Sequence, residues 1–228
     1  MQLLKYLQAQ GMGSRKQCMA LLKDEYVIIN GVLYTQPNID IDPKQVTSLK
    51  IDNADLIPIP VPYFYIRIHK PTGYETSHKP QFYPSVFSLL PERLRHLDMQ
   101  AVGRLDADTT GVLILTNDGQ FNHRCTSPKH KLPKLYRVSL KHAAAENLCS
   151  ELKKGVLLHD ENEIVQASEA ILSDPYTLKL TVTSGKYHQV KRMIAAAGNR
   201  VTALHRSAFG SWTVDDLSVS QWQFFQPK

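Results

Sequence analysis

The sequence predicts an α+β protein in two parts, a small N-terminal unit followed by a larger domain. Apolar residues recur with helical spacing in some segments and alternate with polar residues in others, so both helices and strands are expected. Residues 56–62 read Leu-Ile-Pro-Ile-Pro-Val-Pro. Because proline fixes φ and supports neither a helix nor a central strand, this segment is predicted to be an extended linker. The expected divisions are therefore residues 1–55, 56–62 and 63–228.

The N-terminal unit predicts the order helix, helix, hairpin. Apolar side chains with helical spacing mark the two helices, namely Leu3, Leu4 and Leu7 in the first and Met19, Leu21 and Leu22 in the second. Ser14 precedes the second helix and is expected to cap it, because a serine hydroxyl accepts from free N–H groups of a first turn. Residues 26–34 then read as two short strands joined by an Asn30-Gly31 turn.

The larger domain carries local signals for strands around a polar loop. Val112 to Leu115 is a short apolar run and is expected to be a buried strand. The polar residues from Gly103 to Gly111 precede it as a loop, and a turn is expected at residues 117–119. The other segments with clear signals are strands at 134–140 and 178–182 and an amphipathic helix over 190–197 that ends at Gly198-Asn199.

The positive charge of the chain is concentrated in the larger domain. The chain has 27 Lys and Arg against 21 Asp and Glu, a net charge of +6, and residues 1–60 are neutral. Residues 121–141 and 175–214 contain six basic side chains each and no acid. If these stretches meet on one surface, they suit a polyanion such as nucleic acid. A solvated basic face is the alternative interpretation.

Composition also excludes several classes of protein. No window reaches the roughly 18 apolar residues of a membrane helix, and the N-terminus lacks the pattern of a secretory signal. The three cysteines, Cys18, Cys125 and Cys149, form neither a CxxC pair nor a zinc-binding spacing. We therefore expect a cytoplasmic protein without a structural metal or membrane partner. It is expected to be a monomer, since no coiled coil or large exposed apolar stretch is evident.

Two acids in the polar loop are candidates for chemistry. Asp106 and Asp108 lie beside Arg104 just before the buried strand, where a carboxylate can act as nucleophile, base or metal ligand. The alternative is a turn in which each aspartate caps its own backbone. An Asp-x-Asp pair also occurs in metal-dependent nucleotide-sugar transferases, but no third ligand stands at a matched spacing. Tyr136 lies within the first basic stretch, where it is either a base-stacking platform or an ordinary strand tyrosine.

Several strings, taken in order, resemble the RsuA family of pseudouridine synthases. They are Gly103 to Gly111, Thr126-Ser127-Pro128 with Lys134-Leu135-Tyr136, Gly185 to Met193, and Leu204-His205-Arg206. His69 to Gly73 is similar to the first motif of that family's catalytic domain. Gly13-Ser14-Arg15 and Val27 to Gly31 resemble an S4 RNA-binding module. The resemblance covers nearly the whole chain. It implies an S4-like α/β module joined to an α+β catalytic domain with a mixed, largely antiparallel sheet.

The resemblance also implies a role for individual residues. Asp106 matches the single catalytic aspartate, and Tyr136 matches the tyrosine that stacks on the target uracil. Lys191 falls where a basic residue pairs with that aspartate, although its neighbour Arg192 is an alternative. The remaining matches are Val190 packing near the base, Arg104 as a phosphate contact, and Arg15 and Lys16 as RNA contacts of the S4-like module. Asp108 has no catalytic counterpart and is assigned to loop structure.

The implied activity is conversion of a uridine in ribosomal RNA to pseudouridine, without a cofactor or a metal. The strings His188-Gln189 and Leu204-His205-Arg206 resemble the branch acting on 16S rRNA, so 16S rRNA or an assembling small subunit is the expected partner. Three alternatives stay open. They are an enzyme of the same family acting on 23S rRNA, a non-catalytic rRNA-binding assembly factor, and a metal-dependent transferase that uses Asp106 and Asp108.

Overall fold

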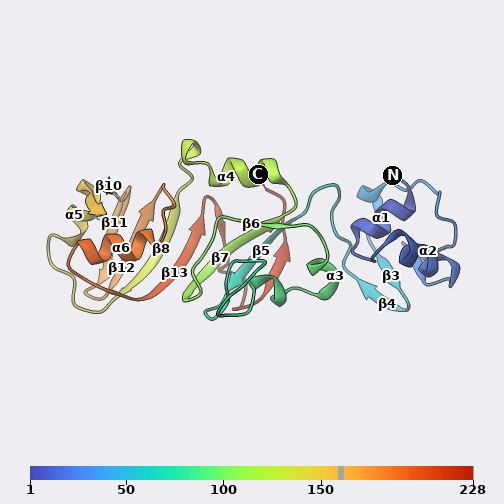
Figure 1. Cartoon of the computed structure of the whole chain (residues 1–228), viewed down its shortest axis with the longest axis horizontal. Helices are drawn as coiled ribbons and strands as arrows, with labels where there is room; N and C mark the ends of the chain where they lie inside the picture. Colours follow the sequence, from blue (N-terminus) through green and yellow to red (C-terminus); the bar gives the residue numbers. More distant parts are fainter. Residues whose placement is uncertain (159–161, 228) are drawn as a thin grey trace.

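The computed structural model describes residues 1–158 and 162–227 of the chain. The molecule is elongated, with the N-terminal unit at one end and a long twisted sheet running through the rest (Figure 1). Within the described residues, no helix is both long enough and apolar enough to cross a membrane. The buried apolar side chains of the N-terminal unit form one group, and those along the long sheet form two others, which accounts for this two-part arrangement.

The N-terminal unit confirms the predicted helix, helix and hairpin. It contains α1 (Leu3–Ala9), α2 (Arg15–Lys23), β1 (Val27–Ile29), β2 (Val32–Tyr34), β3 (Leu49–Ile51) and β4 (Ala54–Leu56). The Ser14 hydroxyl accepts from the Gln17 N–H, and the Gln17 side chain accepts from the Ser14 N–H, so the predicted cap is a full capping box. The predicted Asn30-Gly31 turn joins β1 and β2, with both residues at positive φ.

A second hairpin in the same unit was not predicted. Strands β3 and β4 pair through a turn at Asp52-Asn53, and both of these residues have positive φ without any glycine. Aspartate and asparagine tolerate this conformation better than most residues, but they do so less readily than glycine. The sheet order is β2-β1-β3-β4, and its buried face packs against α1 and α2.

The larger domain is built on one nine-stranded sheet. Its main order is β11-β12-β8-β13-β7-β5-β15, with β6 and β14 attached to β7 and β13. The strands are β5 (Tyr65–Lys70), β6 (Gln100–Val102), β7 (Thr109–Thr116), β8 (Lys134–Leu140), β11 (Glu169–Asp174), β12 (Thr177–Val182), β13 (Val201–Phe209), β14 (Trp212–Thr213) and β15 (Trp222–Phe224). Every pair is antiparallel except β13 with β7. This arrangement confirms the expected α+β class and the mixed, largely antiparallel sheet.

Short helices and a small hairpin surround this sheet. They are α3 (Glu92–Arg95), α4 (Gly119–Thr126), α5 (Leu148–Lys154), α6 (Gln189–Ala196), β9 (Val156–Leu158) and β10 (Glu163–Val165). Single 3₁₀ turns occur at Pro43–Gln45, Val86–Leu89 and Pro128–His130. The amphipathic helix expected at residues 190–197 is α6. Its buried face consists of Gln189, Val190, Met193 and Ile194, and Gly198 follows it at positive φ.

Two predictions around β7 need correction. The polar loop expected from Gly103 to Gly111 is shorter, because residues 109–111 already belong to β7. The turn expected at residues 117–119 is the start of α4, where the Asp118 carboxylate accepts from the N–H groups of Gln120 and Phe121. An aspartate followed by glycine is typical of both a turn and a helix N-cap. The apolar side chains of α4, which pack against β7, favour the helix here.

The proline-rich segment makes specific contacts with both parts of the chain. The fully buried Gln10 side chain donates to the Ile59 carbonyl at 2.9 Å and accepts from the Ile59 N–H at 2.6 Å. On the other side, the Arg93 guanidinium donates to the Ile57 carbonyl. The side chain of Ile59 is buried with the core of the larger domain. The division at residues 55 and 63 stays a prediction.

The centre of the long sheet brings three segments together that are far apart in sequence. Arg206 of β13 pairs in register with Tyr136 of β8 on one side and with Gly111 of β7 on the other. Gly111 has φ +112°, and a Cβ atom there would lie 2.2 Å from the Arg206 carbonyl oxygen. Only glycine permits this approach of β7 to β13, and the loop that carries Asp106 leads directly into β7.

Candidate active site

The loop that carries Asp106 is held in place by a buried lysine. Lys70 ends β5, is fully buried, and donates to the carbonyls of Pro71 at 2.9 Å, Asp106 at 3.0 Å and Thr109 at 3.0 Å. Burial lowers the pKa of Lys70 to about 8, and the negative charges of the two loop aspartates act in the opposite direction. Because the backbone carbonyls of the loop converge on one ammonium group, the loop has a defined shape before any substrate binds.

Lys191 lies between the two aspartates of this loop. Its ammonium is 3.0 Å from Oδ2 of Asp106 and 2.6 Å from Oδ1 of Asp108. The Asp106 side chain is 30% exposed and that of Asp108 is 71% exposed, so Asp106 is the one that faces into the protein. The ion pair spans 85 positions of sequence, and it therefore depends on packing α6 against the end of the sheet.

The ionisation of this cluster follows from the same contacts. Burial disfavours the charged form of Lys191, but the hydrogen bonds to Asp108 and Asp106 outweigh burial and raise the pKa of Lys191. Burial acts likewise against the charged form of Asp108, and the hydrogen bond and charge of Lys191 outweigh it, so the pKa of Asp108 is lowered. Lys191 and Asp108 are therefore both charged throughout the physiological pH range.

The second oxygen of the Asp106 carboxylate faces a histidine. Nε2 of His188 lies 3.4 Å from Oδ1 of Asp106, and the His188 ring stacks on Tyr187 with ring centroids 3.8 Å apart. His188 has φ +47° at the residue that precedes α6. The turn is fastened by the buried side chain of Gln189, which accepts from the Ser184 hydroxyl and the Lys186 N–H. A single loop therefore positions both groups that flank Asp106.

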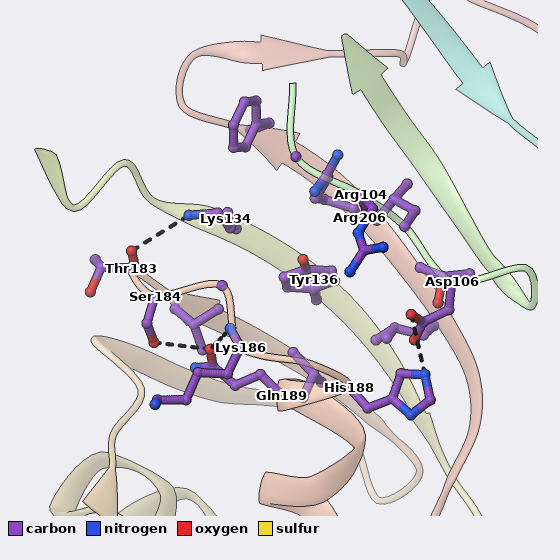
Figure 2. A pocket seen from close by; sticks show the side chains of 18 of the residues that line it. Arg104, Asp106, Lys134, Tyr136, Thr183, Ser184, Lys186, His188, Gln189 and Arg206 are labelled. Carbon is purple, nitrogen blue, oxygen red and sulfur yellow. Dashed lines mark hydrogen bonds and ion pairs between the residues drawn. The ribbon is translucent and has the colours of Figure 1, made fainter. Parts of the chain in front are cut away.

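Asp106 stands at the edge of a cavity of about 410 Å³. This volume is within the range of sites that enclose a small ligand. The aromatic ring of Tyr136 and the side chain of Val190 are buried in its wall, and Arg104 is an exposed residue at its rim. Figure 2 shows Tyr136 in the middle of the cavity wall, with Asp106 and His188 together at one side. An aromatic ring and a carboxylate therefore line the same cavity.

The structure brings together five of the residues that the sequence singled out and separates three. Asp106, Tyr136, Lys191, Val190 and Arg104 line this one cavity. Arg192 is next to Lys191 on α6, but its guanidinium donates to the Tyr187 carbonyl at 3.1 Å. Arg15 and Lys16 are exposed at the start of α2, at the opposite end of the molecule (Figure 1).

Sequence reasoning missed three residues of the site. Lys70 and Arg206 belong to strings that the sequence singled out, but no role followed from them. Each becomes informative only through burial, since a fully buried lysine or arginine needs a specific partner. His188 was noted only as part of a string. Its position depends on a left-handed backbone conformation, which histidine adopts uncommonly and which no sequence signal indicated.

The geometry disfavours a metal site at the two aspartates. The Lys191 ammonium occupies the position between the carboxylates in which a divalent ion bound by this pair would have to lie. Among residues 1–158 and 162–227, no group of three or more His, Cys, Asp or Glu side chains is arranged to hold a metal. The arrangement instead suits acid–base or nucleophilic chemistry by one ionised carboxylate beside an enclosed planar ligand.

Comparison with known proteins identifies the class of enzyme to which this fold and site belong. Residues 64–196 match the family described as RNA pseudouridylate synthase, and these residues contain the Asp106 loop, Tyr136 and α6. The chain belongs to the RNA pseudouridylate synthase family. It is therefore an isomerase that forms pseudouridine in RNA.

Curated relatives and a solved structure extend the likeness to almost the whole chain. The chain is 36% identical over 216 residues to the ribosomal small subunit pseudouridine synthase A of Yersinia pestis, covering 95% of this chain and 90% of that protein. Over 160 residues it is 40% identical to the protein of that name from Escherichia coli K12, covering 70% and 69%. A crystal structure of a pseudouridylate synthase is 32% identical, with a TM-score of 0.69 and coverage of 99% and 96%.

Proposed function

We propose that the protein converts one specific uridine of 16S ribosomal RNA, at the uridine-516 type of site, to pseudouridine. The observation that carries this proposal is the Asp106 carboxylate, paired with Lys191 at the edge of a base-sized cavity that Tyr136 lines. The choice of substrate is supported by the printed names of the relatives from Yersinia pestis and Escherichia coli, which refer to the ribosomal small subunit.

The reaction needs no external reactant. The N1–C1′ bond of the uridine breaks, the uracil rotates, C5 bonds to C1′, the hydrogen on C5 leaves as a proton, and N1 gains a proton. Because a stacked uridine hides these atoms, the nucleotide has to be flipped out of its helix at a cost of a few kcal/mol. In this proposal the cavity beside Tyr136 receives the flipped base, and no cofactor or metal takes part.

Each of the predicted site residues has a place in this proposal. Asp106 is the catalytic carboxylate, Lys191 orients it through their ion pair, and Tyr136 stacks on the uracil. Val190 packs against the base, and Arg104 at the cavity rim contacts a phosphate of the RNA. The other basic residues proposed to contact RNA phosphates are Arg192 near the cavity and Arg15 and Lys16 on the S4-like N-terminal unit. Phosphate contacts of this kind orient the RNA and contribute affinity.

The protein is proposed to act on the RNA as a monomer in the cytoplasm. The closest competing function is modification of 23S rRNA by the same chemistry, and a non-catalytic assembly factor is the next. The intact Asp106, Tyr136 and Lys191 cluster argues against the assembly factor, because RNA binding alone does not need a carboxylate held beside the base cavity.

The proposal is tested by mapping pseudouridine in RNA treated with the protein. Transcripts of 16S and 23S rRNA and small-subunit assembly intermediates are incubated with the wild-type chain or with Asp106→Asn, in the presence of a metal chelator. Carbodiimide labelling and primer extension then locate each pseudouridine. We expect one new stop in 16S rRNA that is absent with Asp106→Asn. A stop in 23S rRNA alone would identify the other substrate, and binding without any stop would support the assembly factor.

A further inference from the structure

Arg206 is a buried cation of the cavity and has no counter-ion among residues 1–158 and 162–227. It is 2% exposed, lines the cavity together with Tyr136 and Asp106, and belongs to the central strand β13. Its Nε donates to the Val112 carbonyl at 2.9 Å, and its Cζ lies 4.9 Å from the centre of the Phe209 ring. Its Nη2 is buried and has no hydrogen-bond partner in the part of the chain that the structure describes.

No carboxylate of the described residues neutralises this charge. Asp106 and Asp108 are both paired with Lys191, and no ion pair of the described residues includes Arg206. A buried guanidinium without an anion is costly, and a buried donor without an acceptor adds to that cost. The cavity wall therefore holds a positive charge that no carboxylate of the described residues neutralises.

The direction of the guanidinium connects this charge with the substrate. Figure 2 shows Arg206 next to Tyr136, with the end of its guanidinium on the side of Tyr136 and Asp106. In the proposed function the cavity on this side holds the flipped uracil. A phosphate is a less suitable partner for a side chain this deeply buried, because it is bulky and because the exposed Arg104 is available at the rim.

The chemistry of the reaction creates an acceptor that this donor fits. When the N1–C1′ bond breaks, the bonding electrons stay with the uracil, and the negative charge is shared by N1 and the carbonyl oxygens O2 and O4. The base then has to turn about its N3–C6 axis so that C5 takes the place of N1. The same turn exchanges the positions of O2 and O4. One fixed donor beside a carbonyl position can therefore hold the base before and after the turn.

Resting on the proposed function, we infer that Arg206 is a further catalytic residue. Its guanidinium donates a hydrogen bond to a carbonyl oxygen of the target uracil and stabilises the negative charge on the detached base. A preorganised donor directed at developing charge contributes typically 10²–10³ in rate. Because the charge develops only during the reaction, Arg206 contributes to the rate of the chemical step much more than to RNA affinity.

The first part of the test separates rate from binding. We expect Arg206→Met to lower the single-turnover rate on the target rRNA by roughly 10²–10³, with the Kd for RNA within about threefold of wild type. Arg206→Lys is expected to be intermediate, since lysine keeps the charge but lacks the planar fork. Arg95→Met removes an exposed arginine outside the cavity and serves as the matched control. A thermal melt of each variant checks that it is folded.

The second part locates the acceptor with modified RNA. Sulfur is a weak acceptor, so 2-thiouridine or 4-thiouridine at the target position weakens a bond from Arg206 to the base. We expect these substitutions to slow the wild-type protein by about tenfold and to slow Arg206→Met no further, because coupled changes are not additive. A phosphorothioate on the 5′ side of the target nucleotide is expected to slow the two proteins by the same factor. The same comparisons of modified and unmodified RNA are made with Arg206→Lys, which provides the test if Arg206→Met does not fold.

Three results would overturn the inference alone. The first is a single-turnover rate for Arg206→Met within threefold of wild type. The second is a thiouridine substitution that slows Arg206→Met by the same factor as it slows wild type. The third is that the phosphorothioate, and not a thiouridine, slows wild type but slows Arg206→Met no further. The last result would assign Arg206 to a phosphate. If the wild-type protein forms no pseudouridine in any rRNA, the proposed function fails and this inference fails with it, so the two failures are distinguishable.

Discussion

Replacing Lys191 with methionine isolates the contribution of the cation that holds Asp106. Methionine keeps an unbranched chain of similar length but removes the ammonium, which is 3.0 Å from Asp106 and 2.6 Å from Asp108. A hydrogen bond to a charged group contributes about 1.5–3 kcal/mol when buried, and an exposed ion pair about 0.2–1 kcal/mol. The side chains of Lys191 and Asp106 are 25% and 30% exposed, so the value for this pair lies between these limits.

We therefore expect Lys191→Met to lose about 1.5–2 kcal/mol of transition-state stabilisation, which is roughly a 10–30-fold lower rate. Reattachment at C5 releases the C5 hydrogen, so tritium release from RNA labelled at C5 of uridine measures turnover directly. The assay uses saturating enzyme and a single turnover, so that changes in RNA affinity do not contribute. Lys191→Arg is expected to retain most of the rate, and Lys153→Met, an exposed lysine of α5, is the control. A Lys191→Met rate within threefold of wild type would refute this account of the site.

Three further predictions follow from other contacts. Because the pKa of Lys70 in the folded protein is about 8, below the ordinary 10.5, protonated Lys70 destabilises the fold and the penalty disappears as the pH rises from 8 towards 10.5. Urea unfolding should therefore show wild type gaining about 2 kcal/mol relative to Lys70→Met between pH 7.5 and 10, and a pH-independent difference would contradict this. Gly111→Ala places a Cβ 2.2 Å from the Arg206 carbonyl oxygen and should cost about 2–4 kcal/mol in thermal or urea unfolding. Gly73→Ala, at positive φ in open space, should cost about 1 kcal/mol, and equal losses would argue against close packing at Gly111. In an Asp106→Asn background, Tyr136→Ala should weaken binding of target RNA roughly 5–150-fold, as expected for lost base stacking, while Tyr136→Phe stays within threefold. Equal affinities for these two variants in a filter-binding titration would rule out the stacking role.

Much of the local structure could be predicted because its signals lie within about ten residues of one another. The Ser14 cap, the Asn30-Gly31 hairpin and the buried run at residues 112–115 each depend on neighbouring residues, and all three were confirmed. Where a local signal allowed two outcomes, as at Asp118, tertiary packing chose the helix.

The residues of the candidate site also divide into those that the sequence predicts and those that only the tertiary structure identifies. The strings around Asp106, Tyr136 and α6 were sufficient to predict the family, which the match over residues 64–196 confirms. The choice between Lys191 and Arg192 as the partner of Asp106 stayed open, because periodicity states which residues of a helix are buried but not what its exposed positions face. In the structure, Lys191 contacts Asp106 and Arg192 contacts the Tyr187 carbonyl.

By itself, then, the sequence determined the α+β class, the cap, the hairpin, the helix that carries Lys191 and the family. Only the tertiary structure decided how Lys70 organises the Asp106 loop, how Lys191 is shared between two aspartates, and that Arg206 is buried beside Tyr136 with no anion among the described residues. The physical reason is that these contacts join segments tens of residues apart. Their distances depend on how the strands pair in the long sheet and how α6 packs, and no pattern within one segment encodes that arrangement.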